Sequence, residues 1–163
     1  MVNAQEKKAG PVINDFGKVW QIAEPSYPTP TDIEYKVVFD IMYSPDDPSR
    51  PNASIETAAR FLNMHAQSGV PVEKMKVALV VHNKASKELC TNDAYQNRYG
   101  VKNPNAAMIA SLLSAGTEII FCGQSSVSRN FPIDQTIKGV KLSLSAMTAL
   151  IDLQNKGYHL IKF

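Results

Sequence analysis

Cysteine is scarce in this sequence of 163 residues, which contains only Cys90 and Cys122. Two cysteines cannot form a disulfide framework or a four-cysteine zinc site, and their spacing is not Cys-x-x-Cys. The three histidines, His65, His82 and His159, have neither the His-Glu-x-x-His spacing of zinc enzymes nor a cysteine partner close in sequence. We therefore expect neither a metal ion nor a cofactor.

An excess of one charge and long apolar runs are also lacking. Seventeen Lys and Arg stand against fifteen Asp and Glu, a net charge of +2, which is too small to attract the phosphate backbone of a nucleic acid. The longest apolar stretches, Val77 to Val81 and Ile119 to Cys122, are far shorter than the roughly 18 residues of a membrane helix. We expect a soluble protein with no nucleic-acid or membrane partner.

The N-terminus leaves the compartment open. It has no apolar signal region, yet Val2-Asn3-Ala4 followed by Gln5 is similar to the small-residue end of a cleaved export signal. Both a periplasmic location after cleavage and a cytoplasmic location remain hypotheses.

Glycine motifs for familiar chemistries are missing as well. The eight glycines form neither Gly-x-Gly-x-x-Gly nor Gly-x-x-x-x-Gly-Lys, so no nucleotide-binding loop is predicted. The stretch Gly123 to Val127 is one residue short of the Gly-x-Ser-x-Gly motif of serine hydrolases, and the only later histidine, His159, lies in a predicted apolar strand.

Proline divides the chain into two parts. Seven of the ten prolines lie in the first 51 residues, which predicts an extended N-terminal arm over residues 1–34. Apolar residues between Val12 and Tyr27 suggest that this arm docks on its own subunit or on a neighbour. A single α/β domain over residues 35–163 follows and begins with a strand at 35–42.

The rest of the sequence alternates between strand and helix patterns, which is typical of an α/β fold with a mainly parallel sheet. Further strands are predicted at 75–81, 117–122, 139–144 and 158–163, and helices start near Asn52, Asn103 and Ser145. A polar stretch, residues 84–102, lies between the second strand and the next helix. In such folds, sites form beyond the carboxyl ends of the strands.

Cys122 ends a predicted strand at a strand-to-helix junction. Gly123 lets the backbone turn closely, and the amides after it, including those of Gln124 and Ser125, are placed to point at the sulfur as a helix N-terminus. That partial positive charge lowers a thiol pKa from its ordinary value of ~8.5 and favours the nucleophilic thiolate. The alternative is that Cys122 is simply a small buried hydrophobic residue.

Four other side chains complete the candidate site. His82 follows the neighbouring strand and is placed to accept the thiol proton, or it merely caps the strand end. Asn83 and the side chain of Gln124 are candidate hydrogen-bond donors to a bound group, or plain turn residues. Cys90 is a candidate resolving cysteine for Cys122, or a surface residue with no role in catalysis.

Five segments together resemble the DsrE/DsrF-like (YchN-like) family of sulfur-relay proteins, over about residues 35–163. They are Val81-His82-Asn83-Lys84, Asn92-Asp93-Ala94-Tyr95-Gln96, Asn103-Pro104-Asn105, Phe121-Cys122-Gly123-Gln124-Ser125 and Leu144-Ser145-Ala146-Met147-Thr148-Ala149-Leu150. The resemblance implies a three-layer α/β/α domain (DsrEFH-like) with a parallel five-stranded sheet, assembly into trimers or hexamers, and a persulfide-holding cysteine, which by position is Cys122.

Two functions follow from these observations. The first is a sulfur carrier or sulfurtransferase-like protein, in which the Cys122 thiolate takes up sulfane sulfur as a persulfide and passes it to a thiol-bearing partner protein. The second is a non-catalytic oligomeric module that binds a small ligand in the strand-end pocket of His82, Asn83, Cys122 and Gln124. The candidate substrate-binding residues are Asn83, Gly123, Gln124 and Ser125.

Overall fold

The computed structural model describes residues 6–162, so the export-signal pattern of residues 2–5 and the last predicted strand residue, Phe163, lie outside the described part. A single five-stranded parallel sheet forms the centre of the molecule, in the order β4-β3-β2-β1-β5. Its strands are β1 (Tyr35–Ile41), β2 (Met75–Val81), β3 (Glu118–Cys122), β4 (Lys141–Ser143) and β5 (His159–Ile161).

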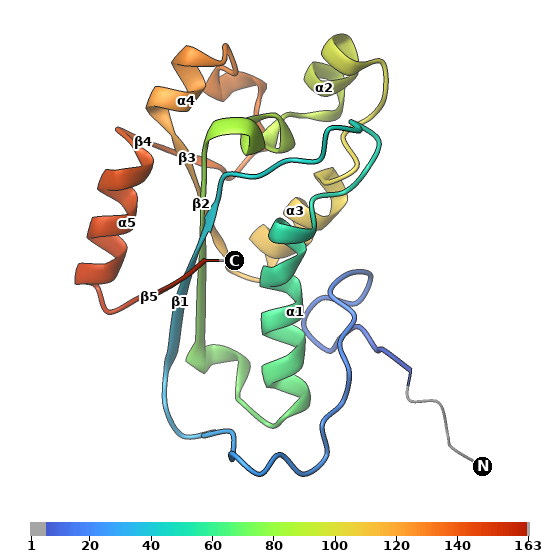
Figure 1. The fold of residues 1–163 in the computed structure, drawn as a ribbon, viewed down its shortest axis with the longest axis vertical. Helices are drawn as coiled ribbons and strands as arrows, with labels where there is room; N and C mark the ends of the chain where they lie inside the picture. Colours follow the sequence, from blue (N-terminus) through green and yellow to red (C-terminus); the bar gives the residue numbers. More distant parts are fainter. Residues whose placement is uncertain (1–5, 163) are drawn as a thin grey trace.

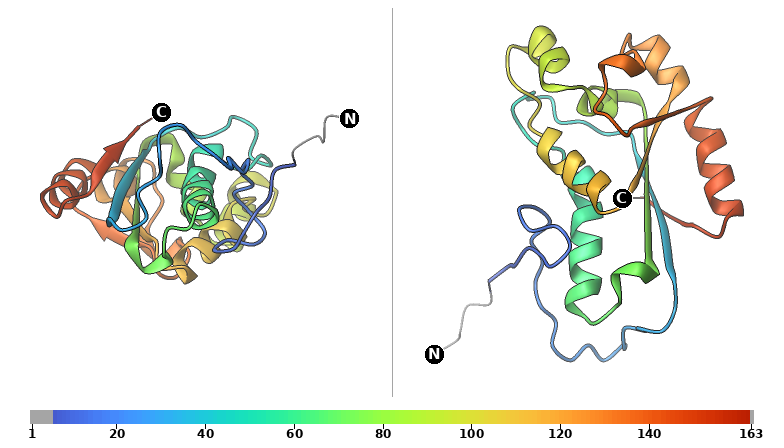
Figure 2. Two further views of the ribbon diagram at one scale, coloured as in Figure 1. Left: turned by 90° about the horizontal axis from the view of Figure 1, so that it is seen from below. Right: turned by 180° about the vertical axis from the view of Figure 1, so that it is seen from behind.

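Helices cover both faces of this sheet (Figures 1 and 2). α1 (Ala53–Gln67) and α3 (Ala106–Ser114) lie on one face, and α5 (Ala146–Asn155) lies on the other. α2 (Asn92–Tyr99) and α4 (Gly123–Ser128) lie beyond the carboxyl ends of the strands. The predicted three-layer α/β/α fold with a parallel five-stranded sheet is confirmed.

The alternation of side chains along β2 separates the core into two layers. Val77, Leu79 and Val81 pack with α1 and α3, whereas Ala78 and Val80 pack with α5. Both sets are buried, as a nearly continuous apolar strand in the middle of a parallel sheet requires. Because side chains alternate, even-numbered positions at the ends of β1, β2 and β3 share the α5 face.

Capping residues mark where the helices begin. One of these helices, α2, was not predicted from the apolar pattern. Asn52 caps α1 through its side chain, which accepts a hydrogen bond from the Ser54 N–H. α2 lies within the polar stretch 84–102, is capped by Thr91 and buries only Tyr95. Its sequence lacks an apolar stripe, so periodicity alone could not find it.

The N-terminal arm docks on α1 of the same chain. The buried side chain of Asn63 accepts a hydrogen bond from the Ile13 N–H and donates to the carbonyls of Ile13, Phe16 and Gly17. Ile13 is itself buried, whereas the later arm residues Trp20, Ile22 and Tyr27 stay exposed. Part of the arm therefore has its docking surface within its own subunit.

Within residues 6–162, the structure contains no helix whose length and apolar character would let it cross a membrane.

Candidate functional site

Cys122 is both the last residue of β3 and the N-cap of α4. Its side chain belongs to the small core layer beneath α5, and only 4% of the residue is exposed. The backbone N–H groups of Ser125, Ala146 and Gln124 and the Ser125 hydroxyl lie around the sulfur as donors that favour its thiolate form, while the thiol makes no capping hydrogen bond to α4. The first turns of two helices, α4 and α5, thus converge on one sulfur atom.

These donors lower the pKa of the Cys122 thiol. Burial alone would raise the pKa of Cys122, but the hydrogen bonds from Ser125, Ala146 and Gln124 outweigh it and hold the pKa below its ordinary value. Hydrogen bonds to the charged form stabilise that form selectively. The expected consequence is a larger thiolate fraction at neutral pH than a free cysteine has.

Gly123 permits the close approach of α5 to this site. A Cβ atom at this position would lie 2.5 Å from the Ser143 carbonyl oxygen and 3.1 Å from that of Leu144. The Gln124 side chain donates to the same Leu144 carbonyl at 3.3 Å. The loop that leads into α5 therefore packs directly on the start of α4.

Ser125 links the sulfur to the end of the neighbouring strand. Its hydroxyl oxygen accepts a hydrogen bond from the Asn83 N–H at 3.0 Å, so its own proton is free to point toward Cys122. Asn83 has a left-handed backbone, with φ of 54°, and its side-chain oxygen accepts from Arg129. The Asn83 side-chain oxygen and the Gln124 side-chain N–H thus both take part in contacts that hold the start of α4 in place.

His82 lies beside Cys122 on the same face of the sheet. β2 and β3 pair with Val81 opposite Phe121, and extending this register by one residue places His82 next to Cys122. His82 Nε2 donates to Asp40 Oδ1 at 2.6 Å, since an ionised carboxylate can only accept. This bond fixes the ring and leaves Nδ1 as the nitrogen that can accept a proton.

Asp40 and Lys162 are residues that the sequence reasoning missed. Lys162 Nζ lies 2.8 Å from Asp40 Oδ2, and only 7% of the Asp40 side chain is exposed. Burial would raise the pKa of the Asp40 carboxyl, but Lys162 and His82 outweigh it and hold that pKa below its usual value. A lone acidic residue near the end of an apolar strand was the available signal for Asp40.

The structure does not bring Cys90 to Cys122. Cys90 is fully buried in the core layer beneath α1 and α3, on the other side of the sheet, and both cysteines are free thiols. Burial raises the pKa of Cys90 to about 11. The two thiols therefore lie on different sides of the sheet, and their pKa values are shifted in opposite directions.

Metal-ligating side chains do not cluster in the described part of the chain. Over residues 6–162, no group of three or more His, Cys, Asp or Glu residues is close enough to hold a metal ion.

Comparisons with known proteins relate this geometry to a family. The solved structure of a protein of unknown function, MTH1491 from Methanobacterium thermoautotrophicum, is similar in fold, with a TM-score of 0.61 and 18% sequence identity over 80% of this chain and 100% of that chain. A search of curated proteins finds no match. The sequence profile of the DsrE/DsrF-like family matches residues 36–163, which is most of the chain. This protein therefore belongs to the DsrE/DsrF-like family.

Proposed function

We propose that this protein is a sulfur carrier or sulfurtransferase-like protein that holds sulfane sulfur as a persulfide on Cys122. Membership of the DsrE/DsrF-like family implies a function of the sulfur-relay kind. The observation that supports the persulfide proposal is the group of donors from Ser125, Ala146 and Gln124, which lowers the pKa of the Cys122 thiol despite its burial. A thiolate is the form that attacks sulfur.

The chemistry of loading is a displacement at sulfur. With thiosulfate as donor, the Cys122 thiolate attacks the outer sulfur, a sulfur–sulfur bond forms to Cys122, and sulfite leaves with the electron pair of the broken bond. In transfer, the thiolate of a partner protein attacks the terminal sulfur of the persulfide, and Cys122 leaves as a thiolate. The N–H groups that stabilise the Cys122 thiolate also stabilise this leaving group.

His82 is the proposed proton acceptor for the thiol. Asp40 accepts from its Nε2, which leaves Nδ1 for the proton of Cys122. Asp40 is in turn paired with Lys162. Asp40 and Lys162 act through His82 and are positioning residues in this proposal.

The proposal includes two kinds of partner, a thiol-bearing acceptor protein and further copies of this chain in a trimer or hexamer. Support comes from an exposed apolar strip next to the site, formed by Leu144 in the loop before α5 and by Met147 and Ile151 on α5. Contiguous exposed apolar surface marks interaction sites. The strip begins two residues before Ala146, whose N–H contacts the Cys122 sulfur.

Intact-mass spectrometry after incubation with thiosulfate or polysulfide tests the proposal. We expect wild type and Cys90→Ala to gain one sulfur atom that a thiol reductant removes, and Cys122→Ser to gain none. His82→Gln should load more slowly at neutral pH and remain folded. Loading of Cys122→Ser at the wild-type level would contradict the proposal.

The second candidate is a non-catalytic ligand-binding module of the same fold, favoured by the 4% exposure of Cys122. It predicts no sulfur gain in any variant. The same mass spectra therefore separate the two candidates.

A further inference from the structure

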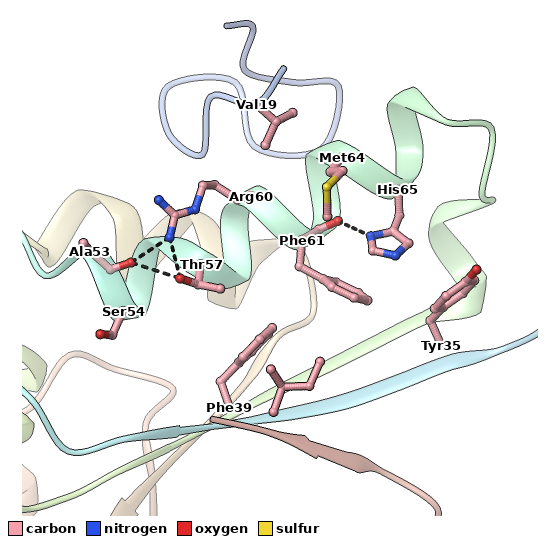
Figure 3. A pocket seen from close by; sticks show the side chains of 11 residues that line it. Val19, Tyr35, Phe39, Ala53, Ser54, Thr57, Arg60, Phe61, Met64 and His65 are labelled. Carbon is pink, nitrogen blue, oxygen red and sulfur yellow. Dashed lines mark hydrogen bonds between the residues drawn. The ribbon is translucent and has the colours of Figure 1, made fainter. Parts of the chain in front are cut away.

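A groove of about 670 Å³ lies on the face of the sheet opposite Cys122 (Figure 3). Its walls are α1 on one side and Phe39 of β1 with Ile161 of β5 on the other, and Val19 of the N-terminal arm lies at its rim. The volume falls within the roughly 300–1,000 Å³ of small-molecule sites. The groove does not touch the residues of the candidate sulfur site.

The two ends of the groove differ in character. At the start of α1 it is polar, with the hydroxyls of Ser54 and Thr57 and the guanidinium of Arg60, which reaches back to the Ala53 carbonyl. Toward the end of α1 it is lined by Phe61, Met64, His65 and Tyr35. A ligand that fits both ends has a polar head and an apolar body.

The charge of Arg60 is not neutralised within the described residues 6–162. Its Nη2 donates to the Thr57 hydroxyl at 2.6 Å and to the Ala53 carbonyl at 3.3 Å, both neutral acceptors, and it forms no ion pair with a described carboxylate. Glu56, one turn earlier, instead accepts the Gly17 N–H. Three of the five guanidinium N–H donors thus remain for an anion, and the N-terminal end of α1 adds partial positive charge.

The apolar end has no comparable cation available. The pKa of His65 is held below its ordinary value because the ring is buried, and its Nδ1 faces the Phe61 carbonyl at 2.8 Å. The ring packs between Tyr35 and Phe61, with ring centroids 4.8 Å and 4.0 Å away. His65 therefore belongs to the apolar wall at neutral pH.

We propose that this groove binds a free aliphatic monocarboxylate, with the carboxylate on Arg60 and the chain along α1 toward Met64. The Arg60 donors that remain, Nε–H and the two N–H groups of Nη1, offer charge-assisted hydrogen bonds to a carboxylate. From Ala53 to Met64 the helix rises about 16 Å, at 1.5 Å per residue, which matches an extended chain of about twelve carbons at roughly 1.25 Å per carbon. The site is independent of the sulfur chemistry of Cys122.

Calorimetric titration of the full chain with dodecanoate, below its micelle concentration, tests the proposal. We expect saturable binding that is at least about tenfold weaker for Arg60→Gln, since a hydrogen bond to a charged group is lost. Arg50→Gln, which removes an exposed arginine outside the groove, is the matched control and should bind as wild type. Hexanoate and dodecyltrimethylammonium, which lack the chain length and the negative head respectively, should bind much more weakly.

Location is tested with a dodecanoate analogue that carries a photoreactive diazirine at its tail. Crosslinks should fall on the Phe61 to His65 stretch, and Met64→Gln should weaken dodecanoate more than hexanoate. Equal binding of dodecanoate and dodecyltrimethylammonium, or equal affinities of Arg60→Gln and Arg50→Gln, would overturn the proposal. So would a change in sedimentation of Met64→Glu from an oligomer to a monomer, because the groove would then be an interface between copies of this chain.

Discussion

The two cysteines show how the surroundings of a side chain set its reactivity. Both are buried, yet the pKa of Cys90 is raised to about 11, whereas that of Cys122 is lowered. The difference lies in the hydrogen-bond donors around the Cys122 sulfur, which outweigh its desolvation. Burial alone is therefore a poor guide to whether a cysteine is reactive.

Ser125 contributes two donors that favour the Cys122 thiolate, its backbone N–H and its hydroxyl. Ser125→Ala removes only the hydroxyl, so we expect the pKa of Cys122 to rise and the thiolate fraction at neutral pH to fall about tenfold. The measurement is the pH dependence of alkylation by iodoacetamide. Ser128→Ala in the same helix is the control, and identical pH profiles of the two variants would exclude the hydroxyl as a contributor.

Asp40 contributes to the stability of the fold in a way that depends on pH. Because Lys162 and His82 hold its pKa in the folded protein below the usual value, its ionic contribution is complete above about pH 4 and is lost as the pH falls through the folded-state pKa. Asp40→Asn should lower the free energy of unfolding by about 1–2 kcal/mol at neutral pH, and by less in acid. Urea unfolding across the acid range measures this, and a loss that does not shrink in acid would refute it.

The sequence led to Cys122, His82 and the turn after β3, because a strand ending in a cysteine and a glycine is visible locally. It could not predict the Asp40–His82 contact or the donation from Ala146 to Cys122, since both depend on how distant segments align. The sequence also did not predict the contacts of the Asn83 side chain with Arg129 and of the Gln124 side chain with the Leu144 carbonyl. Contacts between residues close in sequence could therefore be predicted, whereas contacts between distant segments could not.

At the scale of elements, β2 was predicted with the same bounds as in the structure and β3 within one residue, because burial on both faces leaves a strong signal. α2 was not predicted, because it depends on a Thr91 cap and the left-handed Gly100 rather than on an apolar face. Capping signals are short and are easily lost within a polar stretch.

The contact between α4 and the loop before α5 depends on the absence of a side chain at Gly123. Gly123→Ala would place its Cβ 2.5 Å from the Ser143 oxygen, so the loop must move and carry the Ala146 N–H away from Cys122. We expect a loss of about 1–3 kcal/mol in unfolding free energy together with a higher pKa of Cys122. Thermal unfolding and alkylation profiles test both, and an unchanged alkylation profile would show that the loop does not control the thiol.

The attachment of the N-terminal arm to α1 is centred on Asn63. Asn63→Ala leaves the buried backbone groups of Ile13, Phe16 and Gly17 without this partner, so we expect a loss of about 2–4 kcal/mol and faster proteolysis within the arm. Asn63→Asp should be as damaging because an added oxygen cannot donate. Asn155→Ala, at the exposed end of α5, should match wild type, and a protease-resistant arm in Asn63→Ala would contradict the assignment.

At the scale of the whole molecule, the exposed strip of Leu144, Met147 and Ile151 predicts self-association. Sedimentation velocity at micromolar concentration should give a species larger than the 17.9 kDa chain, and Met147→Glu with Ile151→Glu should reduce it to the monomer. Val72→Glu, at an exposed position outside the strip, is the control. A single monomeric species for the wild type would contradict the predicted oligomer.

Because α4 and α5 converge on Cys122, the same surroundings that favour its thiolate form also shield the sulfur from solvent. In the native state the thiol is ionised more readily but shielded, and in an unfolded chain it would be open to any reagent but mostly protonated at neutral pH. Adventitious oxidants and electrophiles should therefore react slowly with this thiol in both states, because it is shielded in one and protonated in the other. A cognate partner that displaces part of α5 without detaching the Ala146 N–H would gain selective entry, so discrimination among reaction partners is a property of how the helix docks rather than of the sulfur itself.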